Sequence, residues 1–416
     1  MLLEFRVKNY RSIRDEQALN LVASSDKELA ATHLAPTGLK SLPSAVRSAV
    51  VYGPNASGKS TLLQGLDYLR AVVAESATVI QPGQTYNVQP FRLDAAFALQ
   101  PSEFEITFLL GGVRHQYAFS MTAQRIVSES LLVYRSSKPT QLFSRRVDGD
   151  TYAYEFSAYL SGPRKLWQES TRPNALFLST AAQLNSEQLG PVFHWIVRNI
   201  VFLPAGVRVS PDITTAMLAT EEGRTTIREF LSGADISIAD VQAIPRKGVR
   251  AQWVMSATGL QATQEEHEIL FPVFEHTTLH GSAKFELHEE SEGTQRLYGL
   301  IAPVLDCLRD GRVLVVDELE SSLHTLLVRR LMEMFHSPEL NPKGAQLIFT
   351  THDTSLLDHH LLRRDQIWFT EKDTAQATQL YPLSDFSPRK LEALERGYLA
   401  GRYGAVPFLG VLSVGL

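Results

Sequence analysis

One short stretch of this chain has residues at a spacing that suits the binding of a phosphate chain. The spacing is that of a P-loop, Gly-x-x-x-x-Gly-Lys-Ser, and the stretch runs Gly53, Pro54, Asn55, Ala56, Ser57, Gly58, Lys59, Ser60 and Thr61. Glycines let the loop curl so that backbone N–H groups point at an anion. Lys59 supplies a positive charge for β- and γ-phosphates, and the Ser60 hydroxyl can ligate Mg²⁺. We therefore expect a nucleotide-phosphate site; apolar flanks disfavour the alternative of a chance match in a turn.

A pair of acids follows an apolar run far along the chain. Val313–Val316 is fully apolar and leads directly into Asp317 and Glu318. In open α/β sheets, ligands bind at the carboxyl ends of strands, which is where these acids would lie. Asp317 would hold Mg²⁺ opposite Ser60, and Glu318 would polarise or deprotonate the attacking water. The alternative is an acid that caps a helix, which a P-loop in the same chain disfavours.

His352 follows another largely apolar stretch, residues 346–350. The two residues directly before it are Thr350 and Thr351. Its side chain could hydrogen-bond a γ-phosphate or the attacking water. A lone histidine after a strand is more often structural. The position of His352 after the Asp317–Glu318 pair favours the functional interpretation.

A third group of residues precedes a long amphipathic pattern over 293–308. Ser291, Gly293 and Gln295 lie where that helix would begin. A small hydroxyl residue and a glycine at a helix N-terminus form an anion cradle. The alternative is an ordinary capped helix start, with Ser291 as the cap. The place of the segment shortly before the Asp317–Glu318 pair favours the cradle.

Periodic patterns indicate the elements that would position these residues. The apolar run 49–51 predicts a strand that leads into the P-loop, and a helix over about 60–73 would point its positive end at the same anion. Alternating segments between 81 and 156 predict an antiparallel β-rich block, and 175–232 is mostly helical in pattern. Further strands are expected at 313–316, 346–350 and 367–369.

These patterns predict an α/β fold of the P-loop NTPase class, with one head built from both ends of the chain around a mixed sheet. The expected borders are 1–80 and 286–390 for the two parts of the head, 81–285 for an inserted β-rich and helical lobe, and 391–416 for a tail. The aromatic residues of the tail, Tyr398, Tyr403 and Phe408, would form a contact surface or pack against the head.

The composition is that of an ordinary globular protein. The chain has 416 residues, of which 44% are hydrophobic and 20% charged, enough for two or three domains. The formal net charge of −5 leaves no global basic surface, so DNA binding would need a local patch. The paired basic residues are expected to be solvated surface instead. They are Arg145–Arg146, Arg164–Lys165, Arg246–Lys247 and Arg363–Arg364.

Three features predict a cytoplasmic protein without membrane contact. The single cysteine, Cys307, can form no intrachain disulfide and is expected to be buried in a helix. The first residues carry an acid and a base too early for a signal peptide. No run of uncharged apolar residues approaches the length of a membrane span.

The order of these motifs resembles an ABC-type ATPase head of the SMC/RecF/OLD group. The resemblance covers about 1–75 and 285–385. It implies ATP and Mg²⁺ as ligands. It also implies a homodimer, or a higher oligomer, in which the Ser291–Gln295 signature of one subunit closes on the γ-phosphate held by the P-loop of another. The segment Ser321-Ser322-Leu323-His324 resembles the D-loop that crosses this interface.

The same resemblance adds two side chains from the first part of the sequence. Arg11 resembles the N-terminal arginine that reaches nucleotide phosphate in such heads; the alternative is a solvated charge. Gln89 lies about where the Q-loop glutamine, a Mg²⁺ ligand, is expected. Gln81 and Gln84 compete with Gln89 for this role.

The overall plan resembles the stand-alone ATPase subunits of bacterial abortive-infection, or phage-defence, operons, chiefly in residues 2–13 and 396–408. This resemblance implies an ATP-hydrolysing switch that controls a partner effector, a nuclease or toxin encoded nearby, with DNA or a phage component as a further candidate partner. The chain lacks long coiled-coil arms and an acidic Toprim cluster after His352. Its signature carries Glu292 and Thr294 where many transporter heads have smaller or amide residues, which disfavours a transporter subunit.

The main alternative is a RecF-like DNA-repair ATPase, which salt-dependent DNA binding would favour. A metal-dependent nuclease within this chain is not expected. Two histidine pairs, His276 with His280 and His359 with His360, lack a third ligand at a recognisable spacing.

Overall fold

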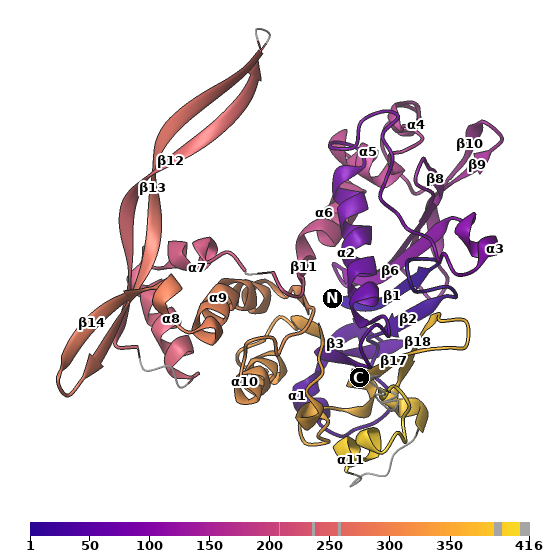
Figure 1. Ribbon diagram of the computed structural model, residues 1–416. Helices are drawn as coiled ribbons and strands as arrows, with labels where there is room; N and C mark the ends of the chain where they lie inside the picture. The colour runs from indigo at the N-terminus through magenta and orange to yellow at the C-terminus, as the bar shows by residue number, and fades with distance from the viewer. Residues whose placement is uncertain (208, 235–237, 257–258, 387–392, 408–416) are drawn as a thin grey trace, which may run out of the picture. The chain divides into compact units, whose positions relative to one another are not determined.

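A computed structural model describes residues 1–207, 209–234, 238–256, 259–386 and 393–407, and for 248–256 and 259–267 it describes the backbone alone. The chain forms two compact units. The first contains Met1–Ala205, Cys307–Glu320 and Leu331–Leu416, and the second contains Gly206–Asp306 and Ser321–Arg330. Figure 1 labels many of the elements of both units. The two ends of the sequence therefore share one unit, and most of the second unit comes from the middle.

A six-stranded mixed sheet lies in the first unit. Its order is β11-β15-β16-β5-β17-β18, and all neighbours are parallel except β17 and β18. The strands are β5 (Ser48–Tyr52), β11 (Ile200–Leu203), β15 (Val313–Val316), β16 (Gln346–Thr350), β17 (Ile367–Lys372) and β18 (Thr378–Pro382). The strands β5, β15 and β16 are buried along their whole length, as parallel strands covered on both faces are. The predicted α/β fold is confirmed.

A seven-stranded antiparallel sheet lies in the same unit, with the order β10-β9-β8-β7-β6-β1-β2. The strands are β1 (Leu2–Lys8), β2 (Gln17–Asn20), β6 (Ser102–Leu110), β7 (Val113–Met121), β8 (Ile126–Tyr134), β9 (Thr140–Asp148) and β10 (Thr151–Phe156). The two-residue turn between β6 and β7 needs positive φ at both positions, which Gly111 (57°) and Gly112 (73°) supply.

This sheet differs from the predicted division of the chain, in which residues 81–285 form one inserted lobe. The strand β1 pairs with β6, so the β-rich block continues a sheet that begins at the N-terminus. Residues 81–205 consequently belong to the unit that holds the P-loop. Alternation along β1 predicts a strand with one buried face, but it carries no information on which distant strand is the neighbour.

The helix α2 (Lys59–Glu75) follows the P-loop and is close to the predicted 60–73. Its buried residues Leu62, Leu66 and Leu69 share one hydrophobic core with Phe5 of β1 and Val51 of β5. The core thus includes residues from both sheets. The other α-helices described in the first unit are α1 (Ala30–His33), α3 (Ala95–Ala98), α4 (Arg164–Ser170), α5 (Phe177–Gln183), α6 (Gly190–Asn199) and α11 (Leu394–Leu399); α10 (Thr325–His336) has residues in both units.

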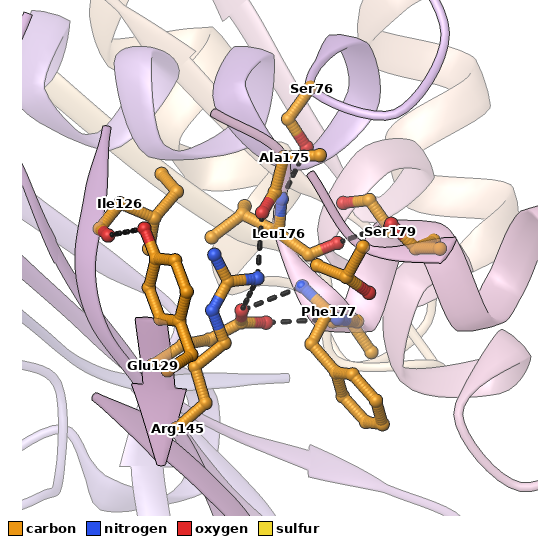
Figure 2. Close-up of polar contacts among 12 residues, drawn as sticks. Ser76, Ile126, Glu129, Arg145, Ala175, Leu176, Phe177 and Ser179 are labelled. Atoms are coloured by element: carbon orange, nitrogen blue, oxygen red, sulfur yellow. Dashed lines mark hydrogen bonds and ion pairs between the residues drawn. The ribbon is translucent and has the colours of Figure 1, made fainter. Parts of the chain in front are cut away.

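A buried polar network holds the C-terminal end of α2 (Figure 2). The Glu129 carboxylate accepts the backbone N–H of Phe177 at the start of α5 (2.6 Å) and lies 3.7 Å from the Arg145 guanidinium. The N–H of Leu176 donates to the hydroxyl of Ser76, the C-cap of α2 (3.2 Å). These contacts connect the far end of the P-loop helix, through α5, to β8 and β9.

Two of the basic residues that were expected at the surface are buried. Arg145 is 1% exposed and Arg363 is 2% exposed. Arg363 pairs with Asp365 at 2.8 Å, as Arg145 pairs with Glu129. The prediction was wrong for these two residues because the carboxylates and carbonyls that compensate a buried guanidinium are brought in by the fold. They cannot contribute to a DNA-binding patch.

The second unit contains a three-stranded antiparallel sheet of β12 (Asp240–Ser256), β13 (Gly259–Thr278) and β14 (Gly281–Glu286). The strand β14 pairs only with Val273–Thr278 of β13, so β12 and β13 continue beyond it as a two-stranded ribbon, as Figure 1 shows. The helices α7 (Asp212–Met217) and α8 (Glu221–Ser232) lie in this unit, and α9 (Glu292–Asp310) begins there. Cys307 on α9 is buried, as predicted.

The described part of the C-terminal tail packs against β17 within the first unit. The rings of Tyr398 and Tyr403 are buried and stack on Phe369 of β17 at centroid distances of 5.5 and 5.9 Å. Of the two predicted roles, packing therefore describes these tyrosines. Phe408 lies outside the described residues. Across the described chain, no helix combines the length and apolar character needed to cross a bilayer.

Two buried histidine rings contact each other in the first unit. The ring centroids of His33 and His336 are 3.7 Å apart. The Nε2 atom of His336 lies 2.8 Å from the Ser48 hydroxyl, and that of His33 lies 3.0 Å from the Leu361 carbonyl. Burial lowers the pKa of both imidazoles below their ordinary value of 6.5, and the nearby Arg47 guanidinium acts in the same direction.

We expect the protein to lose stability as the pH falls below about 6.5. Because the pKa of each imidazole is lower in the folded state, the unfolded chain takes up the proton first as the pH falls. The free energy of unfolding is therefore retained above the unfolded-state pKa. It decreases as the pH drops from there toward the folded-state pKa. Each ring can contribute a slope of up to about 1.4 kcal/mol per pH unit. His336→Gln should make this slope shallower in urea unfolding between about pH 7 and about pH 5.5. His288→Gln, at a 74% exposed side chain, is the control; equal slopes in all three proteins would contradict the prediction.

Candidate nucleotide site

The P-loop connects β5 to α2 in a conformation that requires its two glycines. Gly53 has φ 154° and Gly58 has φ 113°. A Cβ atom on Gly53 would lie 2.4 Å from the carbonyl oxygen of Thr370, and one on Gly58 would lie 2.2 Å from Oγ1 of Thr378. Both positions therefore exclude a side chain by close approach as well as by backbone conformation.

The start of α2 has the features of an anion site. Gly58 is the N-cap and offers no side-chain hydrogen bond. The first N–H groups of a helix have no acceptor within the helix, and its dipole adds a partial positive charge at the same end. An anion placed in the loop would meet these donors.

Lys59 is buried at 6% exposure and turns back toward the loop. Its Nζ donates to the carbonyl oxygens of Gly53 (2.7 Å) and Pro54 (3.2 Å). Burial lowers the pKa of the ammonium group, while the carboxylates of Asp317 and Glu318 oppose that effect. The two acids that follow β15 thus partly offset the cost of burying the Lys59 charge. The ammonium group lies within the loop that would surround phosphate.

The structure brings Asp317 and Ser60 together. The Ser60 hydroxyl donates to Oδ1 of Asp317 at 3.1 Å, although the two residues are far apart in the sequence. Oδ1 also accepts from the hydroxyl of Thr350 at the end of β16 (2.7 Å). Asp317 is 1% exposed, so its carboxylate is held in a fixed position by β15, β16 and α2.

Thr350 is a site residue that sequence reasoning did not single out. Its hydroxyl donates to Asp317 and accepts the backbone N–H of Glu318 (2.7 Å), so one buried side chain fixes both acids. Glu318 has φ 55°, an uncommon conformation for a residue other than glycine, and it is half-buried. The sequence signal for Thr350 is its position at the end of an apolar strand, directly before Thr351 and His352.

His352 lies beside the same strand ends. Its backbone N–H donates to Oε1 of Glu320 (2.6 Å), and its side chain is exposed. The second carboxylate oxygen of Glu320, Oε2, is buried and has no hydrogen-bond partner among the described residues. Glu320 was not predicted as a site residue, yet it ties the His352 segment to the residues that follow Asp317 and Glu318.

A cavity of about 540 Å³ lies beside the P-loop. It is lined by Arg11, Ser12, Asn55, Ala56, Gln89, Pro90, Phe91, Arg92, Leu93, Lys372 and Gln376. The N–H of Arg11 donates to the carbonyl of Gln89 (2.7 Å), and its guanidinium contacts the side chain of Gln64. The cavity thus brings two of the predicted site residues next to the loop.

The competing glutamines lie elsewhere. Gln81 and Gln84 follow the C-terminal end of α2, and their backbone carbonyls accept from the side chain of Asn174 (2.8 and 3.1 Å). A helix of 17 residues is about 25 Å long, and the P-loop is at its other end. Gln89 is therefore the better candidate for the Q-loop role, which stays a prediction.

The residues of the predicted signature belong to the second unit. The Ser291 hydroxyl accepts the N–H of Thr294 (3.1 Å), which is the capping contact of the alternative interpretation. The side chain of Gln295 donates to the carbonyl of Glu290 (2.7 Å). A Cβ on Gly293 would lie 2.9 Å from the carbonyl of Ser322, within the predicted D-loop. The two predicted segments therefore contact each other, and their role at a nucleotide stays a prediction.

One histidine pair has a third neighbour. The potential ligand atoms of Asp358, His359 and His360 all lie within 4.8 Å of one another. The spacing of the histidines alone did not indicate Asp358 as a possible third ligand. Nδ1 of His359 is 3.9 Å from the Asp358 carboxylate. His276 instead lies 2.8 Å from the carboxylate of Glu290.

A glycine-bounded loop at the start of a buried helix, with a buried acid at the end of a parallel strand in the same sheet, defines a P-loop NTPase fold. The sequence matches the family described as an AAA domain, putative AbiEii toxin, of a type IV toxin–antitoxin system, over residues 48–195 and 221–358. The match covers more than half of the chain, and the chain belongs to this family. Family and fold together confirm the predicted P-loop NTPase class.

Two solved structures are similar to the chain at low identity. One is the SMC head domain from Thermotoga maritima, at 14% identity and a TM-score of 0.41, over 92% of this chain and 98% of that chain. The other is cbiO1 from Clostridium perfringens, described as part of the ABC transporter complex cbiONQ, at 10% identity and a TM-score of 0.32, over 96% and 99%. No curated protein matches the chain.

Proposed function

We propose that the chain binds ATP with Mg²⁺, hydrolyses it to ADP and phosphate, and uses this cycle as a switch. The observation that carries the proposal is the hydrogen-bonded path from Ser60 through Asp317 to Thr350, which joins the P-loop helix to two strand ends. Hydroxyl and carboxylate oxygens suit Mg²⁺, so Ser60 and Asp317 would hold the ion, with Gln89 as a further candidate ligand. When bound, the ion neutralises charge on the phosphates.

The other site residues have separate roles in this proposal. Lys59 and the N–H groups at the start of α2 bind the β- and γ-phosphates. Glu318 takes a proton from the attacking water, and His352 hydrogen-bonds the γ-phosphate or that water. The contact of Thr350 with the Glu318 N–H supports this assignment, because it fixes the backbone of the acid that would act as the base.

The switch would close as a head-to-tail homodimer around ATP. In this arrangement Ser291, Gly293 and Gln295 of one copy contact the γ-phosphate bound to the P-loop of the other. The position of these residues at the start of α9 supports the assignment, since a helix N-terminus favours an anion. Arg11 would reach the phosphates from the cavity beside the loop.

The output of the switch would be the control of a partner effector, a nuclease or toxin, in bacterial defence against phage. Support comes from the description of the family, which names a toxin and a type IV toxin–antitoxin system. The alternative, a DNA-repair ATPase, stays a prediction. It would require DNA binding that weakens as the salt concentration rises. Two of the basic residues that could have formed its DNA surface, Arg145 and Arg363, are buried.

Phosphate release from ATP tests the catalytic part of this proposal. We expect hydrolysis to require Mg²⁺ and to be lost on chelation with EDTA. Asp317→Asn removes a charge that binds the ion and should lower kcat about 100-fold or more. Asp150→Asn, at an exposed turn, is the matched control and should keep wild-type turnover. Hydrolysis that persists in EDTA, or wild-type turnover in Asp317→Asn, would contradict the assignment.

A further inference from the structure

The hydroxyl of Thr378, the first residue of β18, contacts three parts of the nucleotide site. It donates to the carbonyl of Ser57 in the P-loop (2.8 Å), lies 2.9 Å from the Ser12 hydroxyl, and accepts from Nζ of Lys372 (3.0 Å). Thr378 is 1% exposed. Gly58 lies so close to its side chain that a Cβ atom on Gly58 would clash with it. The hydroxyl thus uses its one donor position on the P-loop and an acceptor position on Lys372.

Thr370 on the neighbouring strand β17 supports the other end of the loop. Its Oγ1 lies 2.6 Å from Oγ of Ser57 and donates to the carbonyl of Tyr52 (3.2 Å). Its own carbonyl is the group that a Cβ on Gly53 would meet. Because β17 and β18 are paired antiparallel, they form one hairpin that contacts the P-loop at both glycines.

The same hairpin carries Lys372 to the cavity beside the P-loop, where it lies among the lining residues with Arg11 and Asn55. The described lining includes three cationic side chains and no carboxylate, which favours an anionic ligand. Burial lowers the pKa of the Lys372 ammonium group, so this cation is partly removed from water. One of its three N–H donors goes to Thr378, and the others can meet phosphate oxygens.

We propose that Thr378 is a positioning residue for the P-loop and that Lys372, which it holds in place, is a second lysine that binds the phosphates of the nucleotide. The proposal rests on the proposed function, because it needs a nucleotide at the loop. A peptide unit is planar, with its C=O and N–H on opposite sides. By holding the Ser57 carbonyl, Thr378 turns the N–H of Gly58 to the other side of that peptide, as an anion cradle requires.

The test of the positioning role removes one hydroxyl without changing the shape of the side chain. Thr378→Val leaves the carbonyl of Ser57 without its donor and should weaken ATP binding about tenfold or more, because that carbonyl is buried. Thr378→Ser keeps the hydroxyl and should bind ATP within about threefold of the wild type. Thr107→Val, at a buried threonine of β6, is the control for the loss of a strand hydroxyl.

The test of Lys372 separates binding from turnover. Lys372→Met keeps the apolar length of the side chain and should raise the Kd for ATP about tenfold with a smaller change in kcat. Its binding should also depend less on salt concentration, since one phosphate contact is lost. Lys372→Arg keeps the charge and should recover most of the affinity. Calorimetry with ATP at several salt concentrations gives both quantities.

Lys59→Ala distinguishes the failure of this inference from the failure of the proposed function. Wild-type ATP binding by Lys372→Met, or by folded Thr378→Val, would overturn the inference when Lys59→Ala has lost binding. Wild-type binding by Lys59→Ala would overturn the proposed function itself. If Thr378→Val does not fold, Thr378→Ala replaces it, and an affinity equal to that of Thr378→Ser would exclude the positioning role.

Discussion

Glu318→Gln is expected to bind ATP normally and to hydrolyse it about 100- to 1,000-fold more slowly than the wild type. A glutamine has the same shape as the acid but cannot accept the proton of the attacking water. The substitution keeps the backbone N–H of residue 318, which donates to the hydroxyl of Thr350. Binding and catalysis should therefore separate in this variant.

The slow variant should also accumulate the closed state. With ATP and Mg²⁺ it is expected to sediment as a dimer, and with ADP as a smaller species. Adding Ser291→Arg, which places a long cation at the predicted signature, should abolish the dimer without changing the affinity of the P-loop for ATP. The matched control is Glu187→Gln, at an exposed position in the first unit. Turnover in Glu318→Gln equal to that of the wild type would exclude Glu318 as the base.

The parts of the site that follow local rules could be predicted from the sequence. The P-loop is one continuous segment, so its glycines, Lys59 and Ser60 are visible as a pattern. The Asp317–Glu318 pair follows an apolar strand, and parallel strands bring such ends to one edge of a sheet. The structure agrees with that expectation, since Ser60 and Asp317 are hydrogen-bonded at 3.1 Å.

The supporting residues could not be predicted, because their roles depend on which distant elements become neighbours. Thr350, Thr370 and Thr378 are single threonines in strand patterns, a context in which threonine is common. Their contacts arise only when β16, β17 and β18 lie beside the P-loop strand and its loop. For the same reason the sequence did not indicate that β1 pairs with β6, or that Arg145 is buried.

The signature illustrates a different limit of sequence patterns. A serine before a helix can cap it, bind an anion, or do both, since each role uses the same N-terminal geometry. In this structure the Ser291 hydroxyl accepts the N–H of Thr294. A capping contact leaves the other N–H groups of the first turn directed out of the helix, so it is compatible with a γ-phosphate from a second copy. Only the dimer experiment separates the two roles.

Lys59→Ala is expected to weaken ATP binding about 100-fold or more, which corresponds to about 2.7 kcal/mol or more. Lys59 is 6% exposed and its ammonium group is hydrogen-bonded to carbonyls of the P-loop, where a charge interacts more strongly with phosphate than it would in water. The acids Asp317 and Glu318 would then face the phosphates without this cation. Lys165→Ala, at an 89% exposed side chain, is the control for the loss of a lysine. Calorimetric titration that gives equal affinities would contradict the assignment of the loop.

The same two variants test whether nucleotide state controls an effector. Lys59→Ala holds the protein without nucleotide, and Glu318→Gln holds it with ATP, so a switch must give opposite outputs in the two cases. Expressed in cells beside its neighbouring genes, one variant should release the toxic or nuclease activity and the other should suppress it. Identical growth with both variants, together with the expected loss of binding and of turnover in vitro, would leave an ATPase whose cycle does not control an effector. Growth arrest by the chain alone would place the toxic activity in this chain and contradict a partner effector.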